Sequence, residues 1–337
     1  MSPTRLPHRR RRRPRFGVVL GGGGVLGAAW MAGALAALQE RAGQALTDAD
    51  IIVGTSAGSV LAASLRCGVP VETIVAHQRG VPLELIPDLA DLDRDSGALP
   101  PLPRLRLGSP RLLASTARAP HRVHPWVAAS ALVPPGRARH RTLAGLVHGL
   151  LTQAEQLAHP PAGHPWPRRP TWIMAVDYES GRRIAFGRPA APPASLPDAV
   201  VASCSIPGWY EPKVIGDRRY VDGGVRSSTS LDLLSRVALD EVYVLAPMAS
   251  YEPDRPRNPA VRAERLLRQW ITRGLTREVR KVEATGARVT VLTPGPEDLA
   301  AIGINLMDPA RRQRVLETSL HTSPARLSTL TELRPAA

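Results

Sequence analysis

The sequence predicts an α/β protein with a mainly parallel sheet covered by helices. Two short apolar runs, residues 16–20 and 51–53, are typical of buried strands, and a small-residue helical pattern follows each of them. Alternation of strands and helices favours a parallel sheet with helices on both faces. With 337 residues and 43% hydrophobic content, the chain can bury a full core.

The charge of the chain is strongly positive and unevenly distributed. Lys and Arg number 44 against 29 Asp and Glu, and seven arginines lie within residues 1–15. We expect this arm to be disordered, because it has little to bury. Aromatic residues make up only 4% and no basic stripe interleaves with them, so no specific nucleic-acid partner is expected. The arm instead suits peripheral contact with an anionic membrane.

The uncharged run at residues 16–38 imitates a signal peptide or a membrane span. Glycines at residues 21–24 interrupt this run, and glycine is a poor helix former. A strand, a glycine loop and a helix over residues 28–41 are the better interpretation. The two cysteines form no disulfide framework, and no Cys/His cluster has metal-ligand spacing. We therefore expect a cytoplasmic protein, with peripheral membrane contact as a further option, and no metal or organic cofactor.

Regular elements continue beyond the opening. Residues 171–176 and 183–186 predict a strand pair, 213–215 and 219–221 a hairpin, and 241–246 and 288–292 two further strands. Helices are expected over residues 197–203 and 259–284, capped by Ser195 and Asn258, and after Asp308-Pro309 and Ser323-Pro324.

Residues 81–170 are rich in proline and predict short helices. Ser109-Pro110 has the pattern of an N-cap followed by proline at the first helical position. An apolar stripe predicts a longer helix, which either packs on the core or covers the site as a lipid-contacting surface. The stripe consists of Leu143, Leu146, Val147, Leu150, Leu151 and Leu157.

The sequence Gly54-Thr55-Ser56-Ala57-Gly58 predicts a nucleophile elbow. It joins a strand to a helix through a sharp turn, where glycines allow close packing and the serine hydroxyl is exposed. Ser56 would also lie at a helix N-terminus, which favours developing negative charge. The alternative is an ordinary Gly/Ser turn.

The glycine loop after the first strand has two interpretations. Gly22, Gly24 and Gly27 fit G-x-G-x-x-G, which is typical of dinucleotide binding, but that fold expects an acidic residue at the end of the second strand. Here Ser56 follows that strand instead. The loop therefore favours an oxyanion hole for acyl transfer, with the amides of Gly23 and Gly24 as the best donors and that of Gly22 as a further one.

A nucleophilic serine needs a base, and Asp222 is the candidate. It follows a predicted strand and precedes Gly223 and Gly224, which allow close approach to the serine. On its own, Asp-Gly-Gly is also compatible with an ordinary turn.

Together, the glycine loop, the serine elbow and the Asp-Gly-Gly segment resemble the patatin-like phospholipase family over about residues 16–250. Ala202-Ser203-Cys204-Ser205-Ile206-Pro207 supports the resemblance. It implies a three-layer α/β/α fold that hydrolyses acyl esters such as phospholipids, with Ser56 as nucleophile, Asp222 as base and residues 22–27 as the oxyanion loop. Leu26 departs from the family pattern, in which bacterial members often carry Arg or Lys there.

The expected organisation is an arm (1–15), a patatin-like catalytic domain (16–250) with a proline-rich helical insert (81–170), and a C-terminal helix-strand-helix extension (251–337) on the same domain. Three alternatives stay open: a Ser–His–Asp triad using His321, a catalytically silent interaction module, and a nucleotide-binding oxidoreductase. The sequence predicts no oligomeric state.

Overall fold

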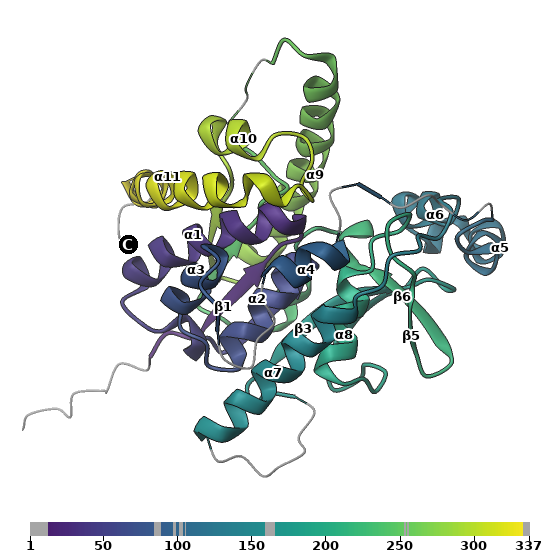
Figure 1. Ribbon diagram of the computed structural model, residues 1–337, viewed down its shortest axis with the longest axis horizontal. Helices are drawn as coiled ribbons and strands as arrows, with labels where there is room; N and C mark the ends of the chain where they lie inside the picture. Colours follow the sequence, from purple (N-terminus) through teal and green to yellow (C-terminus); the bar gives the residue numbers. More distant parts are fainter. Residues whose placement is uncertain are drawn as a thin grey trace, which may run out of the picture.

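The computed structural model describes residues 13–83, 89–96, 99–100, 104, 106–158, 166–252, 254 and 256–332. Within these residues, eight strands form one sheet at the centre of the molecule, in the order β5-β6-β3-β2-β1-β7-β8, with β4 paired to β3 (Figure 1). The strands are β1 (Phe16–Leu20), β2 (Ile51–Thr55), β3 (Thr171–Asp177), β4 (Arg183–Phe186), β5 (Lys213–Ile215), β6 (Arg218–Asp222), β7 (Glu241–Leu245) and β8 (Arg288–Leu292).

The pairing of these strands is mainly parallel. Strands β3, β2, β1, β7 and β8 run parallel to their neighbours in that order. Strands β4, β5 and β6 add antiparallel pairs beside β3. The parallel sheet predicted from the sequence is therefore confirmed, and its antiparallel part comes from the predicted strand pair and hairpin.

Helices cover the sheet on both faces. They are α1 (Gly24–Ala42), α2 (Ala57–Arg66), α3 (Val71–Gln78), α4 (Leu89–Ser96), α5 (Pro110–Arg118), α6 (Pro125–Ser130), α7 (Arg141–Ala158), α8 (Leu196–Cys204), α9 (Pro259–Glu283), α10 (Pro296–Ile302) and α11 (Arg312–Glu332). Short 3₁₀ helices are η1 (Leu46–Asp48), η2 (Pro120–Arg122), η3 (Gly223–Val225), η4 (Leu231–Arg236) and η5 (Pro309–Arg311).

The two apolar faces of the sheet follow from the alternation of side chains along each strand. Val18 and Ile52 point into one core with α1, α2, α7, α8 and α11, whereas their neighbours Val19 and Val53 point into another with α9 and η4. The result is the expected three-layer α/β/α fold. Figure 1 shows α1, α2, α3 and α4 gathered over one side of the sheet.

One edge of β3 carries two different strands in succession. Strand β2 pairs with β3 up to Thr55 opposite Met174, and β6 pairs with it from Asp222 opposite Ala175. Strand β4 overlaps both pairings along β3, so it must occupy the other edge, because a strand has only two edges. Strands β2 and β6 therefore share one edge of β3 and meet end to end, which brings their terminal residues together.

The proline-rich insert forms several of the predicted helices. Ser109 caps α5, and its hydroxyl accepts a hydrogen bond from the Leu112 amide at 3.2 Å. The apolar stripe lies on α7, where Leu143, Leu146, Val147 and Leu150 are buried in the core. The core-packing interpretation of these four residues is confirmed. The side chain of Leu157 lies outside the described residues.

The helices differ from the sequence-based expectation at four places. Helix α1 begins at Gly24 rather than at residue 28, and neither α3 nor α10 was predicted. Ser323-Pro324 begins no new helix but lies inside α11. Tertiary contacts hold the part of α11 that precedes that proline: the Ser319 hydroxyl donates to the Trp30 carbonyl at 2.7 Å, and the Thr322 hydroxyl donates to Asp298 at 2.8 Å.

The described part of the N-terminal arm joins the fold where β1 begins. The Arg15 amide donates to Asp240 Oδ2 at 2.6 Å, and the Arg15 guanidinium lies 3.6 Å from Asp50 Oδ1. Residues 1–12, the larger part of the arm expected to be disordered, lie outside the described residues. The described residues of the arm therefore lie at the end of the sheet where the parallel strands begin, whereas Ser56 lies at the opposite end, where β2 finishes.

Substitution of Gly33 tests the packing of α1 on α11. A Cβ at Gly33 would lie 2.8 Å from the Leu320 amide nitrogen and the Ser319 side chain, so Gly33→Ala should lower the free energy of unfolding by about 1–3 kcal/mol. The matched control is Gly145→Ala on α7, where no atom lies within 4 Å of the new Cβ. There the helix-propensity gain should raise stability by up to about 1 kcal/mol. Urea unfolding of both variants measures the difference, and equal effects would contradict the packing assignment.

Candidate active site

Ser56 lies at a strained turn between β2 and α2. Its backbone has φ 52° and ψ −126°, which is unusual for a residue other than glycine. A Cβ at Gly54 would lie 2.6 Å from the Gly58 carbonyl oxygen, and one at Gly58 would overlap the Leu20 carbonyl. The two glycines let α2 pack directly behind the strand, as the elbow interpretation requires.

Ser203 on α8 holds the backbone of this turn. Its hydroxyl accepts a hydrogen bond from the Ser56 amide at 2.8 Å and donates one to the Met174 carbonyl on β3 at 2.6 Å. The Ser203 side chain is fully buried. It therefore joins the serine turn to the central sheet. The sequence pointed to this segment only through a family resemblance, because a serine near the end of a helix gives no local signal of such a role.

Asp222 lies at the end of β6, beside the serine turn. Its carboxylate accepts a hydrogen bond from the Ser56 side chain and another from the Gly224 amide, the latter at 2.7 Å. Burial raises the pKa of Asp222 to about 6, although both hydrogen bonds oppose the rise. Ser56 is 6% exposed and Asp222 is 5% exposed, so this contact is shielded from bulk water.

The glycine loop lies against Ser56, but its amides are not equally available. A Cβ at Gly22 would lie 3.3 Å from the Ser56 Cβ, so the loop and the serine are in direct contact. The Gly22 amide donates to the Ser228 carbonyl at 2.8 Å, and the Gly27 amide donates to the Gly23 carbonyl at 2.8 Å. Within the part of the chain that the structure describes, the amides of Gly23 and Gly24 have no acceptor. They lie at the N-terminus of α1, where helix amides are unpaired.

A cavity of about 130 Å³ opens beside Ser56. Most of its lining is apolar: Val25, Ala28, Val60, Leu61, Leu92, Leu143, Ile206 and Met307. Among the described residues, Asp93 and Arg312 are the charged ones that line it, and they form a bidentate ion pair with each other. Gly24 and Ser56 lie in the same wall. The cavity can therefore hold an apolar chain next to the serine hydroxyl and the free amides.

Two histidines bear on the choice of base. His321 is exposed on α11 and is not among the residues that line the Ser56 cavity. His140, to which no sequence pattern points, does line it, and its Nε2 lies 3.0 Å from the Cys204 carbonyl oxygen. A carbonyl only accepts hydrogen bonds, so that nitrogen carries the proton. Asp222, by contrast, contacts the Ser56 hydroxyl itself.

Leu26, where the family often has a basic residue, lies in the core. Its side chain is fully buried, and its amide donates to the Leu306 carbonyl at 2.9 Å. The residue therefore offers no charge to the site. At the end of β2, Ser56 occupies the place where a dinucleotide-binding fold has its acidic residue.

Glu278 on α9 supports the loop that follows Asp222. Its carboxylate accepts hydrogen bonds from the hydroxyls of Ser227 and Thr229 at 2.6 and 2.8 Å and from the Leu231 amide at 2.9 Å. This loop contains Ser228, whose carbonyl receives the Gly22 amide. Burial raises the pKa of Glu278. No local sequence pattern indicates this role, because the partners lie far from Glu278 along the chain.

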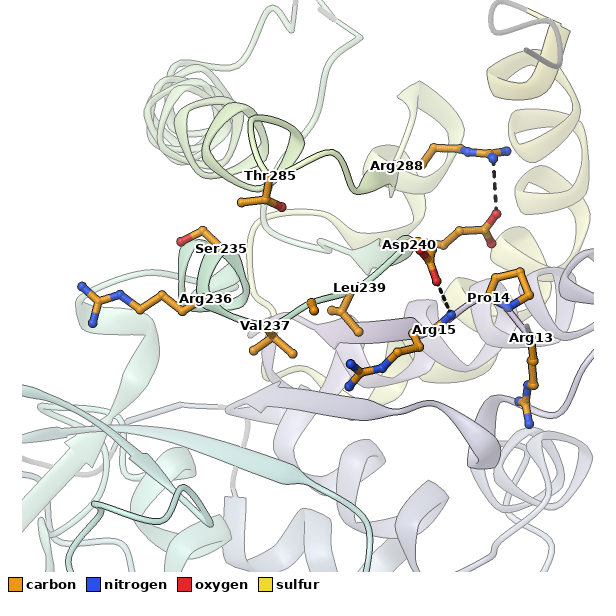
Figure 2. A pocket seen from close by; sticks show the side chains of 12 residues that line it. Arg13, Pro14, Arg15, Ser235, Arg236, Val237, Leu239, Asp240, Thr285 and Arg288 are labelled. Carbon is orange, nitrogen blue, oxygen red and sulfur yellow. Dashed lines mark hydrogen bonds and ion pairs between the residues drawn. The ribbon is translucent and has the colours of Figure 1, made fainter. Parts of the chain in front are cut away.

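A larger hollow of about 780 Å³ lies at the opposite edge of the sheet, where β1 and β7 begin. Figure 2 shows its arginines pointing in different directions rather than toward one point: Arg13, Arg15, Arg236 and Arg288. Its carboxylates are engaged, since Asp240 accepts the Arg15 amide and Glu241 lies 3.6 Å from Arg288. These groups therefore do not converge on a ligand.

The residues that the structure describes contain no candidate metal site and no candidate membrane span. No three His, Cys, Asp or Glu side chains there gather closely enough to hold a metal ion. None of the helices in those ranges combines the length and the hydropathy that a membrane crossing needs.

Replacing Ser203 tests how the serine turn is held. Ser203→Ala leaves the buried Ser56 amide and the Met174 carbonyl without their partner, so the free energy of unfolding should fall by about 1–3 kcal/mol. The control is Ser205→Ala, whose buried hydroxyl bonds only to the Val201 carbonyl of its own helix among the described contacts. Urea unfolding should show a clearly smaller loss for the control, and the reverse order would refute the bridging role.

One protein family and several solved structures are similar to this chain. A family model described as Patatin-like phospholipase matches residues 18–235. Among solved structures, VipD from Legionella pneumophila is 13% identical with a TM-score of 0.41, over 94% of this chain and 67% of VipD. The type III effector protein ExoU is 16% identical with a TM-score of 0.42, over 94% of this chain and 53% of ExoU, so this chain spans about half of its length. No curated protein matches. The family model covers more than half of the chain, which therefore belongs to the patatin-like phospholipase family.

Proposed function

We propose that this protein is a lipid acyl hydrolase that cleaves carboxylic esters, such as those of phospholipids, through a Ser56–Asp222 dyad. Membership of the patatin-like phospholipase family supports lipid esters as the substrate class. The observation that carries the dyad is the hydrogen bond between the Ser56 side chain and the Asp222 carboxylate, at the place where β2 and β6 meet.

In the first half of the reaction, Asp222 takes the Ser56 proton as the hydroxyl oxygen attacks the acyl carbonyl carbon. The carbonyl oxygen becomes an oxyanion, for which the free amides of Gly23 and Gly24 are the donors. One such donor is typically worth about 10²–10³ in rate. Gly22 and Gly27 shape the loop, since their own amides are already bonded.

Collapse of the tetrahedral intermediate breaks the bond to the alcohol, which leaves with the proton from Asp222. The acyl group then stays on the Ser56 oxygen. In the second half, Asp222 takes a proton from water as the water oxygen attacks the acyl carbon. The fatty acid departs, and Ser56 recovers its proton from Asp222.

The composition of the cavity wall supports an acyl chain as the group bound there. Its apolar side chains can bury methylene groups, each worth about 0.8 kcal/mol. The Arg312 guanidinium is already paired with Asp93, so the charged part of this wall is neutral as a pair. The interior of the cavity therefore suits the chain of a lipid rather than its head group.

Replacing the dyad should abolish hydrolysis. Ser56→Ala and Asp222→Asn should each lower kcat/KM toward a chromogenic short-chain ester by about 10³-fold or more, because each removes a group that forms or breaks bonds. A fluorophosphonate probe should label the parent but not Ser56→Ala. His321→Ala is the control and should keep full activity. Activity lost in folded His321→Ala would favour the triad, and no labelling of the parent would favour the catalytically silent module.

The pH profile should report the ionisation of Asp222. The base acts as the carboxylate, so kcat/KM should fall below a pH of about 6 and level off above it. A histidine base would titrate in a similar range, so the control is His140→Gln, which should keep the position of the inflection. Loss of the inflection in that variant would assign it to His140 instead.

A further inference from the structure

Four exposed apolar side chains cluster where α6 and α9 meet. The rings of Trp126 and Trp270 lie 5.0 Å apart between centroids at an angle of 60°. Trp126 is 47% exposed, Trp270 37%, Leu266 65% and Leu267 42%. We call these four residues the tryptophan patch. Large apolar side chains grouped in this way mark an interaction surface rather than scattered surface residues.

The tryptophan patch lies beyond the edge of the sheet that carries Ser56. On α9, buried Arg268 donates to the Pro247 carbonyl at 2.5 Å, and a Cβ at Gly23 would lie 2.7 Å from the Pro247 ring. The turn of α9 that carries Arg268 is thus connected to the glycine loop through Pro247. Figure 1 shows α9 projecting from the body of the molecule.

The other half of the patch is fixed beside Asp222. Helix α6 packs on η3, the turn that directly follows Asp222, and Val127 lies in one apolar cluster with Val221 and Val225. Trp126 and Trp270 therefore reach the patch from elements that flank the two sides of the candidate site.

The charges of α9 beside the patch have one sign at its surface. Glu264 is turned toward Arg265 and Arg268, and Glu278 accepts hydrogen bonds from the loop below. The exposed charged residues of α9 are all cationic: Arg262, Arg273, Arg277, Arg280 and Lys281. A helix face with Trp, Leu and exposed cations is typical of helices that lie in the interface of an anionic bilayer.

We propose that the tryptophan patch docks on an anionic phospholipid bilayer, with the basic side of α9 on the head groups and the Ser56 edge of the sheet turned toward the lipid. This inference rests on the proposed function, since a lipid hydrolase must reach esters held in a membrane. It assigns the membrane contact to α6 and α9, whereas the described residues of the N-terminal arm, 13–15, lie at the opposite end of the sheet, where β1 begins.

The test measures vesicle binding without hydrolysis. In the Ser56→Ala background, the full chain is floated with vesicles of equal parts phosphatidylcholine and phosphatidylglycerol, and with phosphatidylcholine alone. The double variant Leu266→Glu/Trp270→Ser should bind the mixed vesicles about tenfold more weakly, because two inserted apolar groups are lost. Val214→Glu is the matched control. Val214 is 60% exposed on β5, away from the patch, so its substitution should leave binding unchanged.

Three further results decide the proposal. Brominated lipid should quench the tryptophan fluorescence of the parent, and Trp126→Phe/Trp270→Phe should remove most of that quenching. Equal vesicle binding by the parent and the double variant would overturn the proposal. If the parent is a dimer, the double variant is a monomer and neither binds vesicles, the patch is assigned instead to contact with a second copy of the chain.

Hydrolysis of a soluble short-chain ester separates this inference from the proposed function. With Ser56 intact, the double variant should keep that activity, because none of its positions touches the candidate site. If neither parent nor variant hydrolyses the ester, the proposed function fails, while the flotation result still decides whether the patch binds membranes.

Discussion

The candidate site depends on the shared edge of β3. Parallel β2 and antiparallel β6 occupy successive parts of this edge, and their last residues face Met174 and Ala175. Because consecutive residues of a strand lie about 3.3 Å apart along it, two strands that meet end to end on one edge of β3 bring their terminal residues close together. Ser56 and Asp222 need no long or flexible side chain to reach each other, since the pairing of β2 and β6 with β3 already places the two residues side by side.

The surroundings of that edge balance burial against hydrogen bonding. Removal of Asp222 from water favours its neutral form, and the bonds from Ser56 and Gly224 recover part of the lost solvation. The glycine loop shows a similar division. Some of its amides hold the loop in place through Ser228 and Gly23, and those at the start of α1 stay open. If every amide of the loop were hydrogen-bonded within the protein, none would be left to donate to a ligand.

Elements with local signals could be predicted from the sequence, and contacts between distant segments could not. Strands β1, β2 and β8 have apolar runs, and Ser109, Ser195 and Asn258 cap helices as expected. The start of α1 was misplaced, because Gly24 and Gly27 have poor helix propensity and tertiary packing overrides it. No role was predicted for Ser203, His140 or Glu278, since their partners lie on other elements. Family resemblance, rather than any local pattern, joined the glycine loop, Ser56 and Asp222 into one site.

The support that Glu278 gives to residues 227–231 has a consequence for the modularity of the fold. Glu278 and Arg268 lie on α9, outside the segment that the family model matches. A fragment cut at the end of that segment would keep every motif and lose the acceptor beneath the Ser228 loop, together with Pro247, which packs against Gly23, and Arg268, which donates to the Pro247 carbonyl. The segment that the family model matches and the segment that holds the candidate site together are therefore not the same stretch of chain, and a graft or a truncation of this protein has to include α9 as well.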